Sequence, residues 1–146
     1  MLKGIDPLLN PELLKVLAEM GHGDEVTIVD ANFPAAAVAK ATIIGHLLRV
    51  DCDALVALRA VLTVFPLDTF EDEPVTTMQV VGDPSAVPPV VAEAAPILAA
   101  EGFASKSVER FAFYDLAKQS YAVLMTNEGR AYGNFILRKG VIFHEN

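Results

Sequence analysis

Short runs rich in β-branched residues alternate along this chain with longer stretches that carry apolar residues at helical spacing, and this alternation constrains the fold most. The β-branched runs predict strands at residues 25–30, 74–81, 120–129 and 134–143. The amphipathic stretches predict helices at residues 11–20, 51–66 and 88–102, and the alanine-rich residues 31–41 predict a short helix or an irregular connection. The sequence therefore predicts a layered α/β fold, and its length of 146 residues favours one domain over residues 1–146.

Residues with special backbone preferences indicate where the helices begin and end. Asn10 can cap the first helix, Pro11 suits its first position, and Gly21 is expected to end it. Asp51 is expected to cap the second helix. Pro96 is expected to kink or split the third, because proline has no N–H for the helical ladder.

Composition narrows the class of protein. The net charge of −8 argues against a nucleic-acid-binding surface, which needs basic residues to offset phosphate charge. The lone Cys52 excludes an internal disulfide framework and fits a reducing compartment. The apolar stretches are shorter than a membrane span, and the first residues do not resemble a signal peptide. We therefore expect a soluble, cytoplasmic protein with neither nucleic acid nor membrane as a partner.

The stretch MGHGD, residues 20–24, places His22 in a glycine-flanked turn between the first predicted helix and the first predicted strand. Gly21 and Gly23 remove bulk on both sides, so the imidazole can project toward a bound molecule. The same glycines also suit an ordinary helix-ending turn. Both interpretations of His22 remain open on pattern alone.

Asp30 closes the first predicted strand. Ligands of open α/β sheets bind beyond the carboxyl ends of strands, so this carboxylate is a candidate ligand-binding group. An aspartate that bonds to its own turn is the alternative. His22 and Asp30 flank one short strand and are expected at its opposite ends. If they share a site, either the turn folds back or a neighbouring subunit completes the pocket.

Two further groups of polar residues are candidates for a binding site. Arg110 and Tyr114 are four residues apart, which places them on one face of a helix, and the arginine offers donors to hydroxyls or carboxylates. Tyr132 and Asn134 bracket Gly133, where the backbone can approach a ligand closely. A solvated arginine and a plain hairpin turn are the competing interpretations.

The patterns of several cofactor-dependent classes are missing from the sequence. No Cys/His spacing suits zinc, and His46 and His144 lack close partners. No phosphate-binding glycine loop and no nucleophile elbow occur. We therefore expect neither a metal nor a cofactor.

Three blocks of sequence, taken together and in order, resemble the fucose mutarotase and ribose pyranase family. They read LLNPELLKVLAEMGHGDEVTIVDANFP, RFAFYDLAK and AYGNFILRKGV, and the resemblance runs from residue 8 to residue 141. The forms RFAFY and YGN are more similar to the fucose branch than to the ribose branch. In departure from the family pattern, Asn32 stands where fucose-type members often carry a second histidine, and IIGHLLRVDCD replaces a usual aspartate–glycine turn.

The resemblance implies a three-layer α/β/α sandwich with a mixed sheet, ring-like decamers, and sites at subunit interfaces. It assigns the role of proton donor to the histidine of the GH turn, which is His22 here. It assigns sugar binding to Asp30, Arg110, Tyr132, Gly133 and Asn134. Tyr132 is our own candidate for a second acid/base group, and Phe33 or Tyr114 for packing on the apolar face of the sugar.

The function that the resemblance implies is the interconversion of α and β anomers of L-fucose or a related monosaccharide. A proton reaches the ring oxygen while another leaves the anomeric hydroxyl, and the open aldehyde then recloses. General acid–base catalysis by a histidine suits this exchange. The alternatives are pyranose–furanose exchange on D-ribose, and a sugar-binding or regulatory protein without catalysis.

Overall fold

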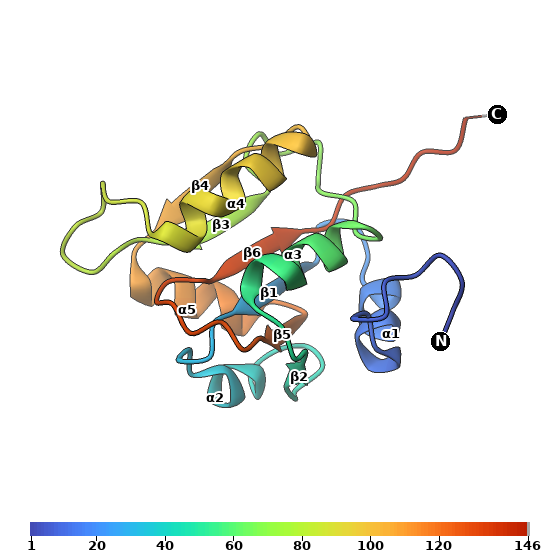
Figure 1. Ribbon diagram of the computed structural model, residues 1–146, viewed down its shortest axis with the longest axis horizontal. Helices are drawn as coiled ribbons and strands as arrows, with labels where there is room; N and C mark the ends of the chain where they lie inside the picture. The colour runs from blue at the N-terminus through green and yellow to red at the C-terminus, as the bar shows by residue number, and fades with distance from the viewer. Residues whose placement is uncertain (146) are drawn as a thin grey trace.

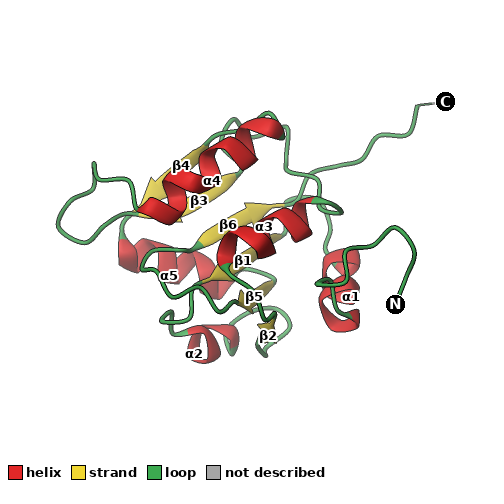
Figure 2. Ribbon diagram, viewed as in Figure 1, coloured by secondary structure: helices red, strands yellow, loops and turns green. Residues whose placement is uncertain are grey.

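A mixed sheet lies at the centre of the molecule (Figures 1 and 2), in a computed structural model that describes residues 1–145. Within those residues the sheet has six strands in the order β2-β5-β1-β6-β3-β4. They are β1 Glu25–Val29, β2 Leu48–Arg49, β3 Val75–Met78, β4 Ser105–Val108, β5 Ala122–Met125 and β6 Phe135–Arg138. Strand β6 runs antiparallel to both of its neighbours, β1 and β3, whereas the other pairings are parallel.

Helices cover both faces of the sheet. Because side chains alternate along a strand, Val26 and Ile28 of β1 pack on one face, with α1 (Pro11–Glu19), α3 (Ala54–Leu62) and α4 (Pro89–Ala100). Val29 packs on the other face, with α2 (Ala35–Ala39) and α5 (Arg110–Gln119). Figure 1 shows α3 and α4 in front of the strands. The expected three-layer α/β/α sandwich with a mixed sheet is confirmed.

The first helix begins as expected and ends in a backbone conformation that differs from the expected one. Asn10 Oδ1 accepts a hydrogen bond from Leu13 N at 3.0 Å, as a capping residue should. The helix ends just before Gly21, as expected, but it does so through extended backbone at Met20 and not through a left-handed glycine. The ammonium of Lys139 satisfies the last carbonyls instead, donating to Leu17 O at 2.7 Å and to Met20 O.

The second predicted helix is capped by Asp53, not by the expected Asp51. Asp53 Oδ1 accepts from Val56 N at 2.9 Å, directly before α3. Asp51 lies too close to the sheet for this role, because Val50 N still donates to Met125 O and so extends the ladder of β2.

Pro96 lies inside α4, which is one continuous helix rather than two. Both Pro96 and Ala92, whose carbonyl loses its helical partner there, are exposed to water on the outer face.

The sequence does not predict strand β4. Its residues, Ser-Lys-Ser-Val, form a polar edge strand without the apolar alternation that identifies a strand in sequence.

Gly140 supplies a stability prediction, because a Cβ there would press on backbone that cannot move aside. It would lie 2.8 Å from Leu67 C and closer still to Leu67 O, while Gly140 N donates to Pro66 O at 2.8 Å. We expect Gly140→Ala to lower the free energy of unfolding by about 1–3 kcal/mol in urea denaturation. Gly129→Ala meets no atom within 4 Å and is the matched control, with an expected change below about 0.5 kcal/mol. Equal effects of the two substitutions would contradict the packing argument.

His46 supplies a prediction about pH. Its Nε2 pairs with Glu12 of α1 and its Nδ1 with Ile44 O, and these hydrogen bonds raise the pKa of the His46 imidazole above its usual value. The protonated ring is favoured in the folded state, so the contact stabilises below the ordinary histidine pKa and is lost as pH rises through the folded-state pKa. An NMR titration should show a raised pKa that Glu12→Gln returns toward the usual value. An unshifted titration in the wild type would show that the pair does not form in solution.

Candidate active site

Predicted binding residues from three separate segments gather in one small cavity. It has a volume of about 180 Å³ and lies where β1 and β3 end and β6 begins. Its walls are Asp30, Asn32, Phe33, Met78, Val81, Arg110, Tyr114, Ala131, Tyr132 and Asn134. Gly133, the remaining predicted binding residue, has its backbone N–H hydrogen-bonded to Asp30. The carboxyl-end location expected for a ligand site is therefore observed.

Asp30 both shapes this cavity and organises its own turn. Its Oδ1 accepts from Asn32 N and Phe33 N, both at 2.9 Å, and its Oδ2 accepts from Gly133 N at 3.2 Å. Burial raises the pKa of the Asp30 carboxyl above its usual value, although these hydrogen bonds favour the ionised form. The turn interpretation of Asp30 is correct, and the carboxylate also lines the cavity.

The loop between β5 and β6 presents Tyr132 and Asn134 in a constrained conformation. Tyr132 has a φ of 63°, a left-handed backbone that is uncommon outside glycine. Its hydroxyl oxygen accepts from Val81 N at 3.1 Å, so its own proton stays available for a ligand. Asn134 Oδ1 accepts from Asp30 N at 3.0 Å, which leaves the amide NH₂ as a donor.

Arg110 brings positive charge to the cavity from the first turn of α5. Its guanidinium lies 4.5 Å from the centre of the Phe111 ring and 6.0 Å from that of Tyr114. Among the described residues it forms no ion pair with a carboxylate. Its planar donors are therefore available for the hydroxyls or carboxylate of a ligand.

His22 lies at the other end of β1, away from this cavity. Its Nε2 is 3.1 Å from Asp68 Oδ1, and its ring centre is 5.2 Å from that of Phe70. The imidazole is 44% exposed, so its remaining nitrogen, Nδ1, is accessible. The His22–Asp68 pair and the polar cavity therefore lie apart, and they are called the two half-sites below.

Asp68 is the partner of His22 that the sequence did not predict. It lies 46 residues further along the chain, and only the folding of β6 against β1 and β3 brings the two together. The carboxylate is buried, with Arg138 Nε donating to Oδ2 and Phe70 N donating to Oδ1, each at 3.1 Å. Burial opposes ionisation, but the hydrogen bonds from Phe70, His22 and Arg138 prevail and hold the pKa of Asp68 below its usual value.

The ionised Asp68 determines which nitrogen of His22 carries a proton in the neutral ring. A carboxylate only accepts hydrogen bonds, so Nε2 must be the protonated nitrogen and Nδ1 the free base. Such a pair can take a proton at Nδ1 and return it, while the carboxylate stabilises the imidazolium. The arrangement is suited to general acid–base chemistry.

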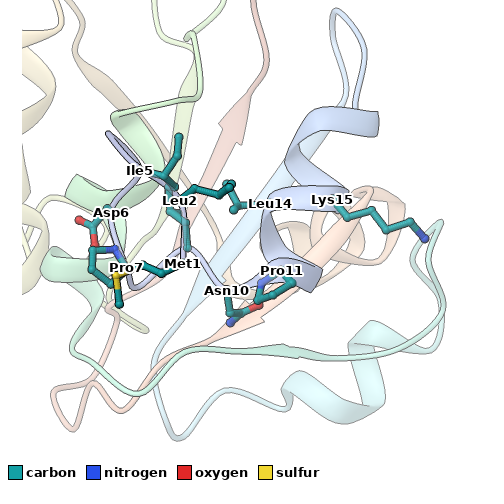
Figure 3. Close-up of a pocket in the computed structure, with 10 residues that line it drawn as sticks. Met1, Leu2, Ile5, Asp6, Pro7, Asn10, Pro11, Leu14 and Lys15 are labelled. Atoms are coloured by element: carbon teal, nitrogen blue, oxygen red, sulfur yellow. The ribbon is translucent and has the colours of Figure 1, made fainter.

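A larger cavity beside α1 contains no pair of a histidine and a carboxylate. It measures about 610 Å³ and is lined by residues of the first fifteen positions, among them Leu2, Ile5 and Leu14 (Figure 3).

Within residues 1–145, no cluster of three or more His, Cys, Asp or Glu side chains could hold a metal ion. In the same part of the chain, no helix has the length and apolar character needed to cross a membrane.

Comparison with known proteins places these observations in a family. The model of the RbsD / FucU transport protein family matches residues 3–142. An L-fucose mutarotase of Haemophilus influenzae (strain ATCC 51907 / DSM 11121 / KW20 / Rd) is 44% identical over 144 residues, which cover 97% of each chain.

Solved structures agree with this match. FucU from Bifidobacterium longum superposes with a TM-score of 0.87 at 44% identity, covering 97% of this chain and 100% of that one. The fucose mutarotase of Streptococcus pneumoniae, in complex with L-fucose, gives a TM-score of 0.83 at 33% identity, with the same coverage. This chain belongs to the RbsD/FucU family.

Proposed function

We propose that this protein is an L-fucose mutarotase, an isomerase that interconverts the α and β anomers of L-fucose or a closely related monosaccharide. The observation that carries the proposal is the His22–Asp68 pair with a free Nδ1, in a chain that also holds a sugar-sized polar cavity. The 44% identity to an L-fucose mutarotase over 97% of both chains supports it. Residues 1–146 act as one mutarotase domain, working in the cytoplasm on a monosaccharide.

The two half-sites work together between copies of the chain. The five residues of β1 span about 16 Å at ~3.3 Å per residue, which is longer than one sugar ring. The histidine of one copy therefore serves the cavity of the next. A contact that runs head to tail from one copy to the next is heterologous, and heterologous contacts that close produce rings. A ring-like decamer, as the family resemblance implies, satisfies this requirement.

The chemistry follows from the groups at each end. Asp30, Arg110 and Asn134 hold the sugar hydroxyls, with Gly133 placing the backbone. Protonated His22 delivers a proton to the ring oxygen as the anomeric hydroxyl loses its own to solvent, and the ring C–O bond breaks to give the open aldehyde. Rotation about the bond to the carbonyl carbon and reclosure then yield the other anomer, with both protons returned.

The apolar part of the cavity favours fucose over ribose. Phe33, Met78, Val81 and Tyr114 contribute apolar surface beside the polar groups, which suits the methyl carbon of a 6-deoxy sugar. A sugar-binding protein without catalysis would have no use for a buried carboxylate that orients a histidine outside its own cavity. The enzyme is therefore the better interpretation of this site.

The first test removes the titratable group at position 22. His22→Gln should lower the rate of fucose anomer exchange by about two to four orders of magnitude, the usual contribution of acid–base catalysis, while fucose affinity changes little. Exchange is measured by saturation-transfer NMR in chelator-treated buffer. His46→Gln, which changes a histidine paired with Glu12 outside the site, is the control and should keep the full rate. A His22→Gln variant that melts early but exchanges anomers normally would leave the histidine with only a structural role.

The second test asks whether two copies build one site. His22→Gln and Arg110→Met should each be inactive alone, because one lacks the proton donor and the other a binding group. Oligomers that contain both variants at random should recover about a quarter of the wild-type rate, since that fraction of interfaces joins an intact histidine to an intact cavity. Mass spectrometry verifies mixing. Verified mixed oligomers without any recovery would contradict a site shared between copies.

A further inference from the structure

We propose that Glu128, on the loop between β5 and β6, is a positioning residue that sets where Tyr132, Gly133 and Asn134 lie. The proposal rests on the sugar site proposed above and deepens it. Glu128 does not line the cavity, so it acts on a sugar only through the residues of this loop.

The side chain of Glu128 forms the surface behind Gly133. A Cβ added to Gly133 would lie 2.9 Å from Glu128 Cγ, closer than such atoms approach in proteins, whereas Asp30 Cβ and Val90 Cγ1 are at an ordinary 3.5 Å. Glu128 is 4% exposed, so this methylene is held inside the protein. The contact leaves Gly133 N at 3.2 Å from Asp30 Oδ2. Glu128 thereby limits how far the loop can move back from Asp30.

The backbone of Glu128 is anchored to the end of β1. Its carbonyl accepts from Ala31 N at 2.8 Å, and its N–H donates to Thr126 Oγ1 at 3.2 Å. Thr126 Oγ1 in turn donates to Val29 O at 2.8 Å. The residue that backs Gly133 is therefore fixed to the same strand end that carries Asp30.

The carboxylate of Glu128 is held by Arg130. Arg130 Nη2 donates to Oε1 at 2.9 Å and Arg130 Nε to Oε2 at 3.4 Å, while Arg130 Nη1 pairs with Glu93 of α4. A buried carboxylate needs such a partner to stay ionised without a large cost. The pairing of Arg130 with Glu128 connects two residues of the β5–β6 loop, and its pairing with Glu93 attaches this loop to α4.

The strained residue of the site lies within this loop. The left-handed φ of 63° at Tyr132 is unfavourable for a side chain larger than glycine, and such strain persists only where the surroundings leave no alternative. The backing of Gly133 by Glu128, with the bonds from Gly133 to Asp30 and from Val81 to Tyr132, supplies that constraint. Loss of Glu128 should therefore release the sugar-binding groups without touching His22.

The test uses Glu128→Ala, Gly133→Ala and the double variant. Each single substitution should raise the KM for L-fucose about tenfold, with a much smaller change in kcat, because the loop is displaced but the proton donor is intact. In the double variant the new methyl occupies space that Glu128 Cγ has left, so KM should rise no more than in one single variant. Glu128→Gln, which keeps the side-chain volume and an acceptor for Arg130, should stay within about twofold of wild type.

Glu93→Gln is the matched control, because it changes the outer partner of Arg130 and leaves the contact with Gly133 in place. It should leave KM unchanged. An unchanged KM in folded Glu128→Ala with only a lowered Tm, or effects that multiply to about a hundredfold in the double variant, would overturn the proposal.

An activity-independent readout separates this proposal from the proposed function. The amide protons of Tyr132 and Gly133 should shift in the NMR spectrum of Glu128→Ala and keep their positions in Glu93→Gln. If the wild type exchanges no anomers but these shifts appear, the mutarotase assignment fails and the positioning role of Glu128 stands. Unmoved Gly133 and Tyr132 signals in Glu128→Ala would reject the positioning role, whatever the wild-type activity.

Discussion

The antiparallel pairing of β6 between β1 and β3 is the constraint on which both half-sites depend. At the start of β6, Asn134 meets the carboxyl ends of its two neighbours and closes the polar cavity beside Asp30. At the end of β6, Arg138 reaches Asp68 and so supports the partner of His22. In a parallel arrangement, the start of β6 would lie at the opposite end of β1 from Asp30. One short strand thus connects the polar cavity at one end of the molecule with the His22–Asp68 pair at the other.

The two buried aspartates show how their surroundings separate their roles. Asp30 receives backbone N–H groups, which are neutral donors, and burial still raises its pKa. Asp68 is also buried, and the hydrogen bonds that it accepts from Phe70 N, His22 and Arg138 lower its pKa, the last two from side chains that can carry positive charge. A charge-assisted hydrogen bond stabilises an ionised carboxylate more than a neutral one does. Asp68, which pairs with His22, is therefore the more readily ionised carboxyl group, and Asp30, which lines the cavity, is the more readily protonated one.

Local patterns predicted those elements whose signals are local. Asn10 and Pro11 predict the start of α1, because capping and the fixed φ of proline act within one turn. The apolar runs predict β1, β5 and β6, because these strands are buried in the centre of the sheet. The apolar pattern of the sequence does not predict the polar strand β4, because it is an edge strand with exposed residues. The choice of Asp53 over Asp51 as a cap also depended on a distant element, since pairing with β5 keeps residue 50 extended.

The sequence by itself determined the alternation of strands and helices, the family resemblance, and the polar residues that gather at one cavity, because each depends on residue types at short spacing. Tertiary structure alone decided that Asp68 orients His22, that this pair lies a strand's length from the cavity, and that Glu128 backs Gly133. These contacts join residues that are far apart in the chain or that meet across a loop. No local periodicity encodes them, since they arise only when the strands pair in their final order and register.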